Sequence, residues 1–203
     1  MSPRTKEQTA RIREERRRQI LDAARQVFSQ KGFDATNVSD VAAAAGVSQG
    51  TIYHYFDSKD DLFMAVFEDW IATCAYQGYA ESTRAADTAA DRLRAFAQTA
   101  AQMMMGSAEF LPVQMEFWSH MLRNDAIRER FRLIFADLRA FLGQIIQAGI
   151  HSGEFRPTDA ESLAAVAVAV YDGLILQWLA DPESVDWQRA SRTLVETTLT
   201  GLL

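Results

Sequence analysis

Apolar residues along positions 37–59 recur at spacings that predict two short helices joined by a tight turn. The stripe of the first helix, at intervals of three and four residues, consists of Val38, Val41, Ala42 and Ala45. Asn37 and Asp40 stand where a capping box closes the start of that helix. Gly46 follows it, as expected at a left-handed helix end, and Ser48 is a good cap for a second helix from Gln49 to about Phe56.

The second helix has one apolar and one polar side. Ile52, Tyr55 and Phe56 share the inward side, so the polar side chains between them face outward. Two short helices with a glycine-containing turn are typical of the helix-turn-helix, whose second helix enters the major groove of DNA. The alternative is a small helical hairpin that only packs.

The residues expected to meet DNA are polar or small and lie at helix starts or on the outward side of the second helix. They are Thr36, Ser39, Ser48, Gln49, Gly50, Thr51, Tyr53, His54 and Lys59. Hydroxyls and free backbone N–H groups at a helix start bind phosphate, and Thr51, Tyr53 and His54 can reach base edges or phosphate. Lys59 is expected in the first turn of the next helix, where the helix dipole disfavours a cation, and a bound phosphate would explain it.

The stretch VAAAAGVSQGTIYHYFDSKDDLF, residues 41–63, preceded by QVFSQKGFDATNV, resembles the TetR family of bacterial regulators. The resemblance covers about the first 65 residues. Gln49 departs from it, because many relatives carry lysine there, and this puts one DNA contact in doubt. The resemblance implies a homodimer that binds a palindromic operator, with a helical ligand-binding and dimerisation domain after the DNA-binding domain.

The remaining periodicity predicts an all-α protein of about nine helices. The expected helices span residues 11–31, the two short helices above, 58 to about 78, 88–105, 113–122 and 125–151, and two more begin at Thr158 and Asp181. The cap signals are a capping box of Thr158 with Glu161 and an Asp181–Pro182 pair. The expected organisation is a basic tail over residues 1–10, a three-helix DNA-binding domain over 11–57, and a helical bundle for ligand binding and dimerisation over 58–203.

The helix expected from Thr158 is apolar nearly all round and rich in small residues, so it must be covered on nearly all sides. A second subunit would cover it, and we expect a twofold interface made by the last two helices. The candidate interface residues are Ala164, Ala167, Val168, Leu176, Leu194 and Leu199.

Soft and aromatic side chains are dense in the C-terminal two-thirds of the chain. The candidate ligand-binding residues are Trp70, Cys74, Phe96, Met103, Met104, Phe117, Trp118, Met121, Phe131, Tyr171 and Trp178. From these residues alone an ordinary packed core is favoured over a ligand cavity. The TetR resemblance favours a cavity, for an inducer that is largely apolar or aromatic. Glu116 and His120, four residues apart, would orient a polar group on it or else face solvent.

The segments EFWSHMLRNDAIRERF and YDGLILQWL are loosely similar to the choline-sensing branch of the family. Such a ligand would call for an aromatic cage around a quaternary ammonium ion.

Charge and cysteine content refine this interpretation. Residues 1–31 carry nine Lys and Arg against four Asp and Glu, although the whole chain has a net charge of −6. A basic end on an acidic body fits a protein that offers one end to a polyanion. The single cysteine indicates a reducing cytoplasm, and polar residues interrupt the longest apolar run, so we expect no membrane span.

The sequence carries no glycine-rich phosphate loop, HExxH motif or paired cysteines, so we expect no enzyme activity, metal or cofactor. The expected function is a homodimeric, cytoplasmic repressor that an unknown small inducer releases from its operator. The alternative is an architectural or regulatory DNA-binding protein without a small-molecule ligand.

Overall fold

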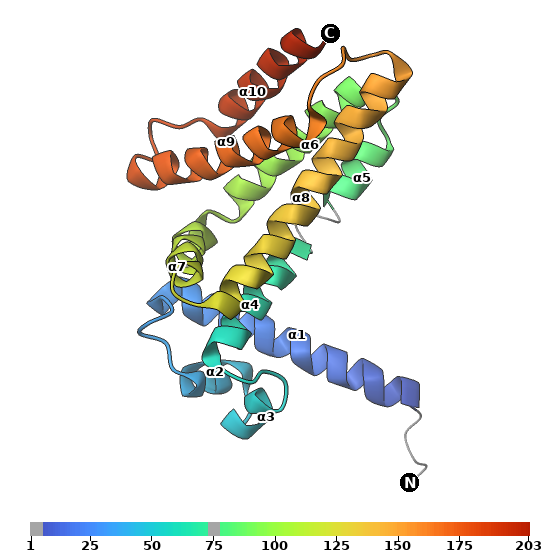
Figure 1. Ribbon diagram of the computed structural model, residues 1–203. Coiled ribbons are helices and arrows are strands. Elements are labelled where there is room, and N and C mark those ends of the chain that lie inside the picture. The colour runs from blue at the N-terminus through green and yellow to red at the C-terminus, as the bar shows by residue number, and fades with distance from the viewer. Residues whose placement is uncertain (1–5, 73–77) are drawn as a thin grey trace. The chain divides into compact units, whose positions relative to one another are not determined.

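The computed structural model describes residues 6–72 and 78–203, and every regular element in those ranges is helical. The ten α-helices are α1 (Lys6–Lys31), α2 (Val38–Ala45), α3 (Gln49–Tyr53), α4 (Lys59–Trp70), α5 (Gly78–Arg84), α6 (Ala89–Gly106), α7 (Leu111–Met121), α8 (Asp125–Ser152), α9 (Ala160–Ala180) and α10 (Trp187–Leu202). A short 3₁₀ helix, η2 (Ala108–Phe110), precedes α7. Figure 1 shows them in chain order from blue to red. The all-α prediction is confirmed.

The chain forms two compact units, and each contains segments that are distant in sequence. Unit 1 consists of Met1–Trp70 and Pro112–Ile127, and unit 2 of Ile71–Leu111 and Arg128–Leu203. Unit 1 therefore contains α4 and nearly all of α7 beside the helix-turn-helix. The domain boundary expected at residues 57/58 from sequence does not coincide with this division.

The core of unit 1 is built around aromatic rings from four parts of the chain. Phe28 of α1 and Phe33 of the following loop both pack on Phe63 of α4, with ring centroids 4.8 and 4.4 Å away. Phe117 of α7 stacks on the Phe63 ring at 3.6 Å. Because these rings are almost completely buried, α7 is as much a part of this core as the N-terminal helices are.

The core of unit 2 joins α5, α6, α8, α9 and α10. Tyr79 and Phe96 lie 4.2 Å apart between ring centroids, and Leu142, Ala164 and Leu199 complete a continuous buried cluster with them. Near the end of α8, Gly149 lies against Phe155 of the segment that follows, and an added Cβ at Gly149 would lie 2.2 Å from the Phe155 ring. A side chain at position 149 is therefore excluded by this close approach.

Several helix boundaries differ from the sequence-based expectation. The first helix begins at Lys6 instead of Arg11, and a helix, α5, occupies Gly78–Arg84 where the sequence predicted an end. The side chain that caps α9 is Asp159, which accepts a hydrogen bond from the Ser162 N–H, and not Thr158. For α9 the neighbouring Asp159 offers the same kind of local signal as Thr158.

The last helix also begins later than predicted. α10 starts at Trp187 behind the cap residue Asp186, so the Asp181–Pro182 pair lies in the turn that precedes it. The Asp186 carboxylate accepts from the Arg189 N–H, which gives the helix its polar start.

Candidate nucleic-acid interface and ligand sites

The turn between α2 and α3 has the geometry that the sequence predicts. Gly46 has φ +63° in the left-handed region, and its N–H bonds back to the last turn of α2. The Ser48 hydroxyl accepts from the Thr51 N–H at 3.1 Å and so caps α3. At the start of α2 the Asn37 N–H donates to Asp40 at 3.0 Å, and this bond, with Lys31 nearby, lowers the pKa of the Asp40 carboxyl. These contacts hold the two helices as a helix-turn-helix.

The polar side of this unit carries most of the residues expected to meet DNA. Ser39, Ser48, Gln49, Gly50 and His54 are exposed, Thr51 is half-buried, and the Tyr53 side chain is 53% exposed. Ile52 is buried on the opposite side of α3, and Phe56 is buried beyond the end of this helix, which stops at Tyr53 and not at about Phe56 as predicted. The division of α3 into an outward polar face and an inward apolar face is therefore as predicted.

Thr36 does not lie on that surface. It is 0% exposed, and its hydroxyl donates to the Gly32 carbonyl at 2.6 Å. Because the hydroxyl satisfies a backbone group inside unit 1, it has no access to a phosphate. Thr36 is accordingly a structural residue of the loop between α1 and α2.

Lys59 also turns inward. Its Nζ donates to the Phe33 carbonyl at 2.8 Å and to the Thr36 carbonyl at 3.0 Å, and it lies 4.1 Å from the centroid of the Phe33 ring. Two carbonyl oxygens and an aromatic face satisfy an ammonium group without any external anion. The phosphate contact expected from the helix-dipole argument is thus replaced by an intramolecular one.

Two arginines of α1 lie beside the residues that follow α3, where the sequence indicated only a basic stretch over residues 1–31. The Arg13 guanidinium lies 5.8 Å from the Tyr55 ring centroid, and that of Arg17 lies 5.6 Å from the Phe56 ring centroid. The i, i+4 spacing places both on one side of α1. The four-residue spacing of Arg13 and Arg17 is visible in the sequence and could have indicated that both lie on one side of α1. Their guanidinium groups bring positive charge close to the end of α3.

Comparison with known proteins decides the family. The family model "Bacterial regulatory proteins, tetR family" matches residues 20–66, and "BetI-type transcriptional repressor, C-terminal" matches residues 77–203. The chain belongs to the TetR family. It is a DNA-binding transcriptional regulator with a C-terminal domain of the BetI type, in a family of regulators and not of enzymes.

Individual relatives of this TetR-family chain cover nearly its full length. The transcriptional regulator TtgR of Pseudomonas putida is 30% identical over 92% of this chain and 89% of its own. The structure of FadR from Bacillus subtilis in complex with stearoyl-CoA is 25% identical, with a TM-score of 0.78 over 91% of this chain and 98% of that one. A protein from Saccharomonospora viridis solved with choline shares the fold at 22% identity, with a TM-score of 0.77 over 93% of this chain and 98% of that one.

The residues expected to bind a ligand are divided between the two units. Trp70, Phe117, Trp118 and Met121 lie in unit 1. The Phe117 ring is 0% exposed and packs on Phe63 and on Phe67, 4.6 Å away, so it belongs to a filled core. Cys74 lies outside the described residues.

In unit 2, Phe96 and Tyr171 line one apolar cavity between α6, α8, α9 and α10, but its volume is only about 40 Å³. The Tyr171 hydroxyl donates to the Ala97 carbonyl at 3.3 Å, and burial raises the pKa of this phenol. Trp178 lines a larger hollow of about 470 Å³ together with Trp187. Phe131 and Met104 are buried, and Met103 is half-buried.

Glu116 and His120 are both half-buried, and both contact Phe33. The Glu116 carboxylate accepts a hydrogen bond from the Phe33 N–H, and the His120 ring meets the Phe33 ring edge to face, with centroids 4.4 Å apart. Both side chains therefore hold the loop before α2. Among residues 6–72 and 78–203, no three His, Cys, Asp or Glu side chains gather as a metal site would require.

The expected dimer residues fall into two groups. Ala164, Val168 and Leu199 are buried in the chain's own core, and Ala167 and Leu194 line the small apolar cavity. Leu176 is 52% exposed, and Val166 of the same helix is 56% exposed. Only the exposed group is available to a partner.

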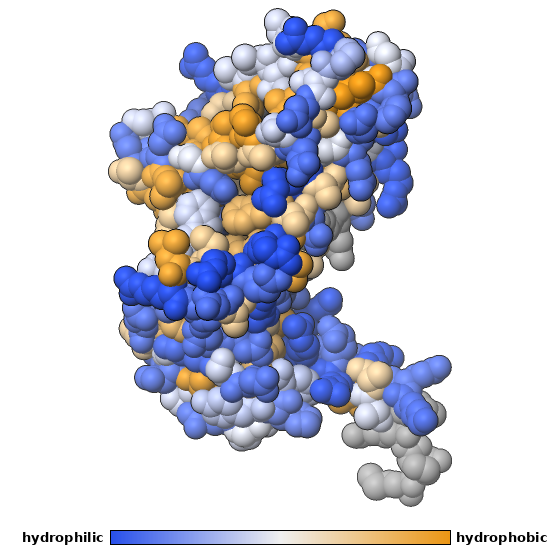
Figure 2. All heavy atoms as spheres, viewed as in Figure 1, coloured by the Kyte–Doolittle hydropathy of each residue, from blue (hydrophilic) through white to orange (hydrophobic). Residues whose placement is uncertain are grey.

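Hydrophobic side chains gather on the face of unit 2 that α9 and α10 form in Figure 2. By length and composition α8 and α9 are apolar enough to cross a membrane, a test that core helices of soluble proteins also pass. Only 17% of the most apolar 18-residue stretch of α9 is buried within the chain, so this helix presents much of its apolar surface outward.

Proposed function

We propose that this TetR-family regulator is a homodimeric repressor that a small, largely apolar or aromatic inducer releases from a palindromic operator. The main support for operator binding is the outward polar face of α3. Gln49, Tyr53 and His54 offer hydrogen-bonding groups on a helix whose other face is anchored by Ile52 and Phe56. A helix so anchored presents its polar side chains to the major groove at a fixed angle.

The proposal of a dimer is supported by the exposed apolar face of α9. Val166 and Leu176 expose about half of their side chains each, and an isologous contact would bury the same surface on both subunits at once. The two copies of α3 would then meet two half-sites about 34 Å apart, one helical turn of DNA. Covering α9 by a second copy also explains why so apolar a helix is so little buried within one chain.

We place the inducer site in unit 2, because the core of this unit is rich in aromatic side chains and the chain matches the BetI-type C-terminal model there. Relatives that carry stearoyl-CoA or choline in their structures indicate that this architecture accepts both apolar chains and a quaternary ammonium ion. Because the apolar cavity holds only about 40 Å³, an inducer must displace side chains such as Tyr171 to enter. Such a ligand binds the open state of unit 2 and shifts the population toward it, away from the operator-binding state.

The protein is proposed to act in the cytoplasm, where its DNA is. A regulator that binds DNA without any inducer is the second candidate function, and the small volume of the apolar cavity favours it. The two candidate functions make different predictions, because only the inducible repressor should lose operator affinity when a metabolite binds.

A fluorescence-anisotropy titration with DNA from the region flanking the protein's own gene, at stated salt, tests the proposal. Specific binding by a dimer is expected, and a Tyr53→Ala/His54→Ala variant should bind about ten- to a hundredfold more weakly while remaining a folded dimer. The control is His151→Ala, which changes an exposed histidine of unit 2. Binding that is equal for all sequences and vanishes with salt would overturn the repressor assignment, and unchanged affinity of the double variant would remove α3 from the interface.

A further inference from the structure

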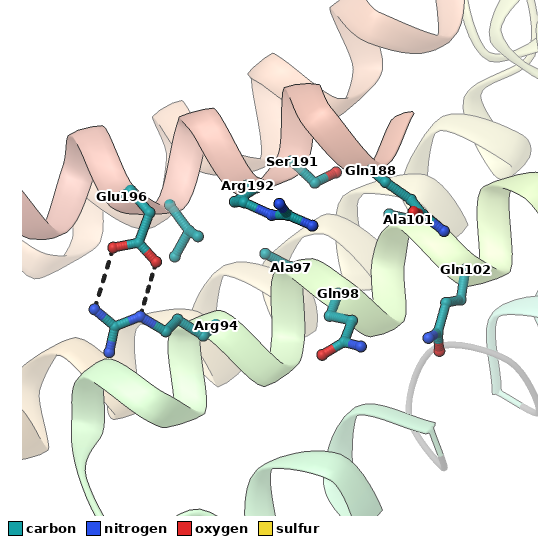
Figure 3. A pocket seen from close by; sticks show the side chains of 10 residues that line it. Arg94, Ala97, Gln98, Ala101, Gln102, Gln188, Ser191, Arg192 and Glu196 are labelled. Atoms are coloured by element: carbon teal, nitrogen blue, oxygen red, sulfur yellow. Dashed lines mark hydrogen bonds and ion pairs between the residues drawn. The ribbon is translucent and has the colours of Figure 1, made fainter. Parts of the chain in front are cut away.

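A polar pocket lies between α6 and α10, next to the small apolar cavity, with which it shares the lining residues Ala97 and Val195. Its volume is about 310 Å³, at the lower end of small-molecule sites, which run from roughly 300 to 1,000 Å³. In Figure 3 Arg192 and Gln188 extend from α10 toward α6, whereas Gln98 and Gln102 of α6 point away from α10 in this view. All of its lining residues belong to unit 2, so its shape depends on one compact body.

The ion pair at one end of the pocket is fully engaged. Arg94 binds both oxygens of Glu196 at 2.8 and 3.1 Å and also pairs with Asp91 at 3.0 Å. These bonds raise the pKa of Arg94 and lower that of Glu196, and the pKa of Asp91 is lowered first by its hydrogen bond with the Thr88 hydroxyl and then by Arg94. All three groups therefore stay charged near neutral pH. The bidentate geometry holds α6 and α10 together there and leaves Arg94 little capacity for a ligand.

Arg192, in contrast, has no such partner. It lines the same pocket, and within residues 6–72 and 78–203 its guanidinium makes no ion pair or hydrogen bond. Its charge helps to depress the pKa of Glu196 from a distance. In Figure 3 its side chain lies above the gap between the helices, with Gln98 and Gln102 across from it on α6 and Gln188 further along α10. A free guanidinium is a five-donor group suited to a carboxylate or phosphate, and the amides add donors around it.

The floor of the pocket contains a hydroxyl without a partner. Ser191 is 2% exposed, and its Oγ has no hydrogen bond of acceptable geometry within the described chain. The hydroxyl of the neighbouring Tyr171 is already engaged, because it donates to the Ala97 carbonyl at 3.3 Å. A buried hydroxyl left unpaired is costly, so it points to a group that the pocket is built to receive.

From the free Arg192, the orphaned Ser191 hydroxyl and the surrounding glutamines, we infer that this pocket binds a small organic oxyanion through its carboxylate or phosphate group. Arg192 takes the charge, Ser191 donates from below, and the glutamines bind the polar remainder of the molecule. The site adjoins the apolar cavity but offers charged and amide groups instead of aromatic rings, and its ligand would connect α10 more firmly to α6.

Isothermal titration of the full chain without DNA tests this site with sodium succinate and sodium phosphate, at constant ionic strength set by NaCl. Saturable binding of one or the other is expected, which also tells the carboxylate from the phosphate, and neutral succinamide should not bind. Arg192→Gln should weaken binding by at least about tenfold, and Ser191→Ala by about three- to tenfold, because each removes a hydrogen bond to a charged group.

Arg189→Gln is the matched control, since it removes one positive charge from the first turn of the same helix at a residue that does not line the pocket. The affinity of the Arg189→Gln variant for the anion should equal that of the wild type. If Arg189→Gln and Arg192→Gln lost the same amount of anion affinity, the effect would be one of overall positive charge, and the proposed site would be wrong. Absence of saturable binding of both anions below about 10 mM would overturn it as well, whatever the outcome with operator DNA.

Discussion

The Glu116 carboxylate on α7 accepts a 2.5 Å hydrogen bond from the backbone N–H of Phe33, 83 residues earlier in the chain. The bond connects a helix from the middle of the sequence to the loop that leads into the helix-turn-helix. An added Cβ at Gly32, which has φ +77°, would lie 2.8 Å from the same carboxylate. The loop therefore has its shape partly because α7 packs into unit 1.

We expect Glu116→Ala to lower the free energy of unfolding by about 1–3 kcal/mol, because the Phe33 N–H would lose its acceptor in a partly buried place. Glu116→Gln keeps an acceptor and should cost less. Urea unfolding followed by circular dichroism measures both. Glu109→Ala, at an exposed residue, is the control and should change the value by no more than about 0.5 kcal/mol. Equal values for the two alanine variants would mean that the bond adds nothing to stability.

Lys59 is the second residue that holds this loop, and its role can be separated from DNA binding. Lys59→Met should lower the free energy of unfolding by about 1–3 kcal/mol, because two carbonyl oxygens lose their donor. The slope of log affinity against log salt for operator DNA should stay the same, since no phosphate contact is lost.

Arg13→Gln is the contrasting variant, because Arg13 is exposed beside Tyr55. It should leave stability nearly unchanged and reduce the salt slope by about 0.9, the value for one phosphate contact. A slope that falls by this amount in Lys59→Met would restore Lys59 to the DNA interface.

The helix-turn-helix was predictable because its signals are local. Asn37, Gly46 and Ser48 act on backbone groups within a few residues, and the structure uses all three as expected. Lys59 and Thr36 were misassigned because their partners, the carbonyls of Phe33 and Gly32, depend on the fold of a loop. The sequence shows only that the helix dipole disfavours a lysine in the first turn. It does not show that the folded loop supplies carbonyl oxygens that accept hydrogen bonds from this lysine.

The same limit applies to the C-terminal domain. A helix that is apolar all round indicates burial without saying which face meets the chain's own core. Ala164 and Leu176 looked equivalent in sequence, yet one is 0% and the other 52% exposed. The pocket between α6 and α10 had no sequence signal at all, because Arg192 and Gln98 come together only in the packed unit.

Leu176→Glu tests the proposed dimer better than a change at Ala167, which lines the chain's own apolar cavity. A carboxylate at an exposed position leaves the monomer folded but would be buried in the interface. The dimer dissociation constant should rise by at least about thirtyfold, from roughly 2 kcal/mol of desolvation. Sedimentation over a range of concentrations measures it. Leu133→Glu, at 49% exposure on α8, is the control and should leave the dimer intact. Identical sedimentation of both variants would argue against an interface at α9.

Asp172 of α9 gives unit 2 a specific pH dependence. Burial raises the pKa of its carboxyl to about 6 from an ordinary 3.8. The folded state therefore holds this proton more tightly than the unfolded state does, and the free energy of unfolding should fall as pH rises from about 4 to 6 and then level off. Asp172→Asn removes this loss and should raise stability at pH 7 by up to about 3 kcal/mol, at 1.36 kcal/mol per pKa unit. Denaturant unfolding between pH 4.5 and 7.5 measures the effect, with the exposed Asp137→Asn as control. If wild type and Asp172→Asn kept parallel pH profiles, the carboxylate would have to be ionised and stabilised in the folded chain, contrary to its burial.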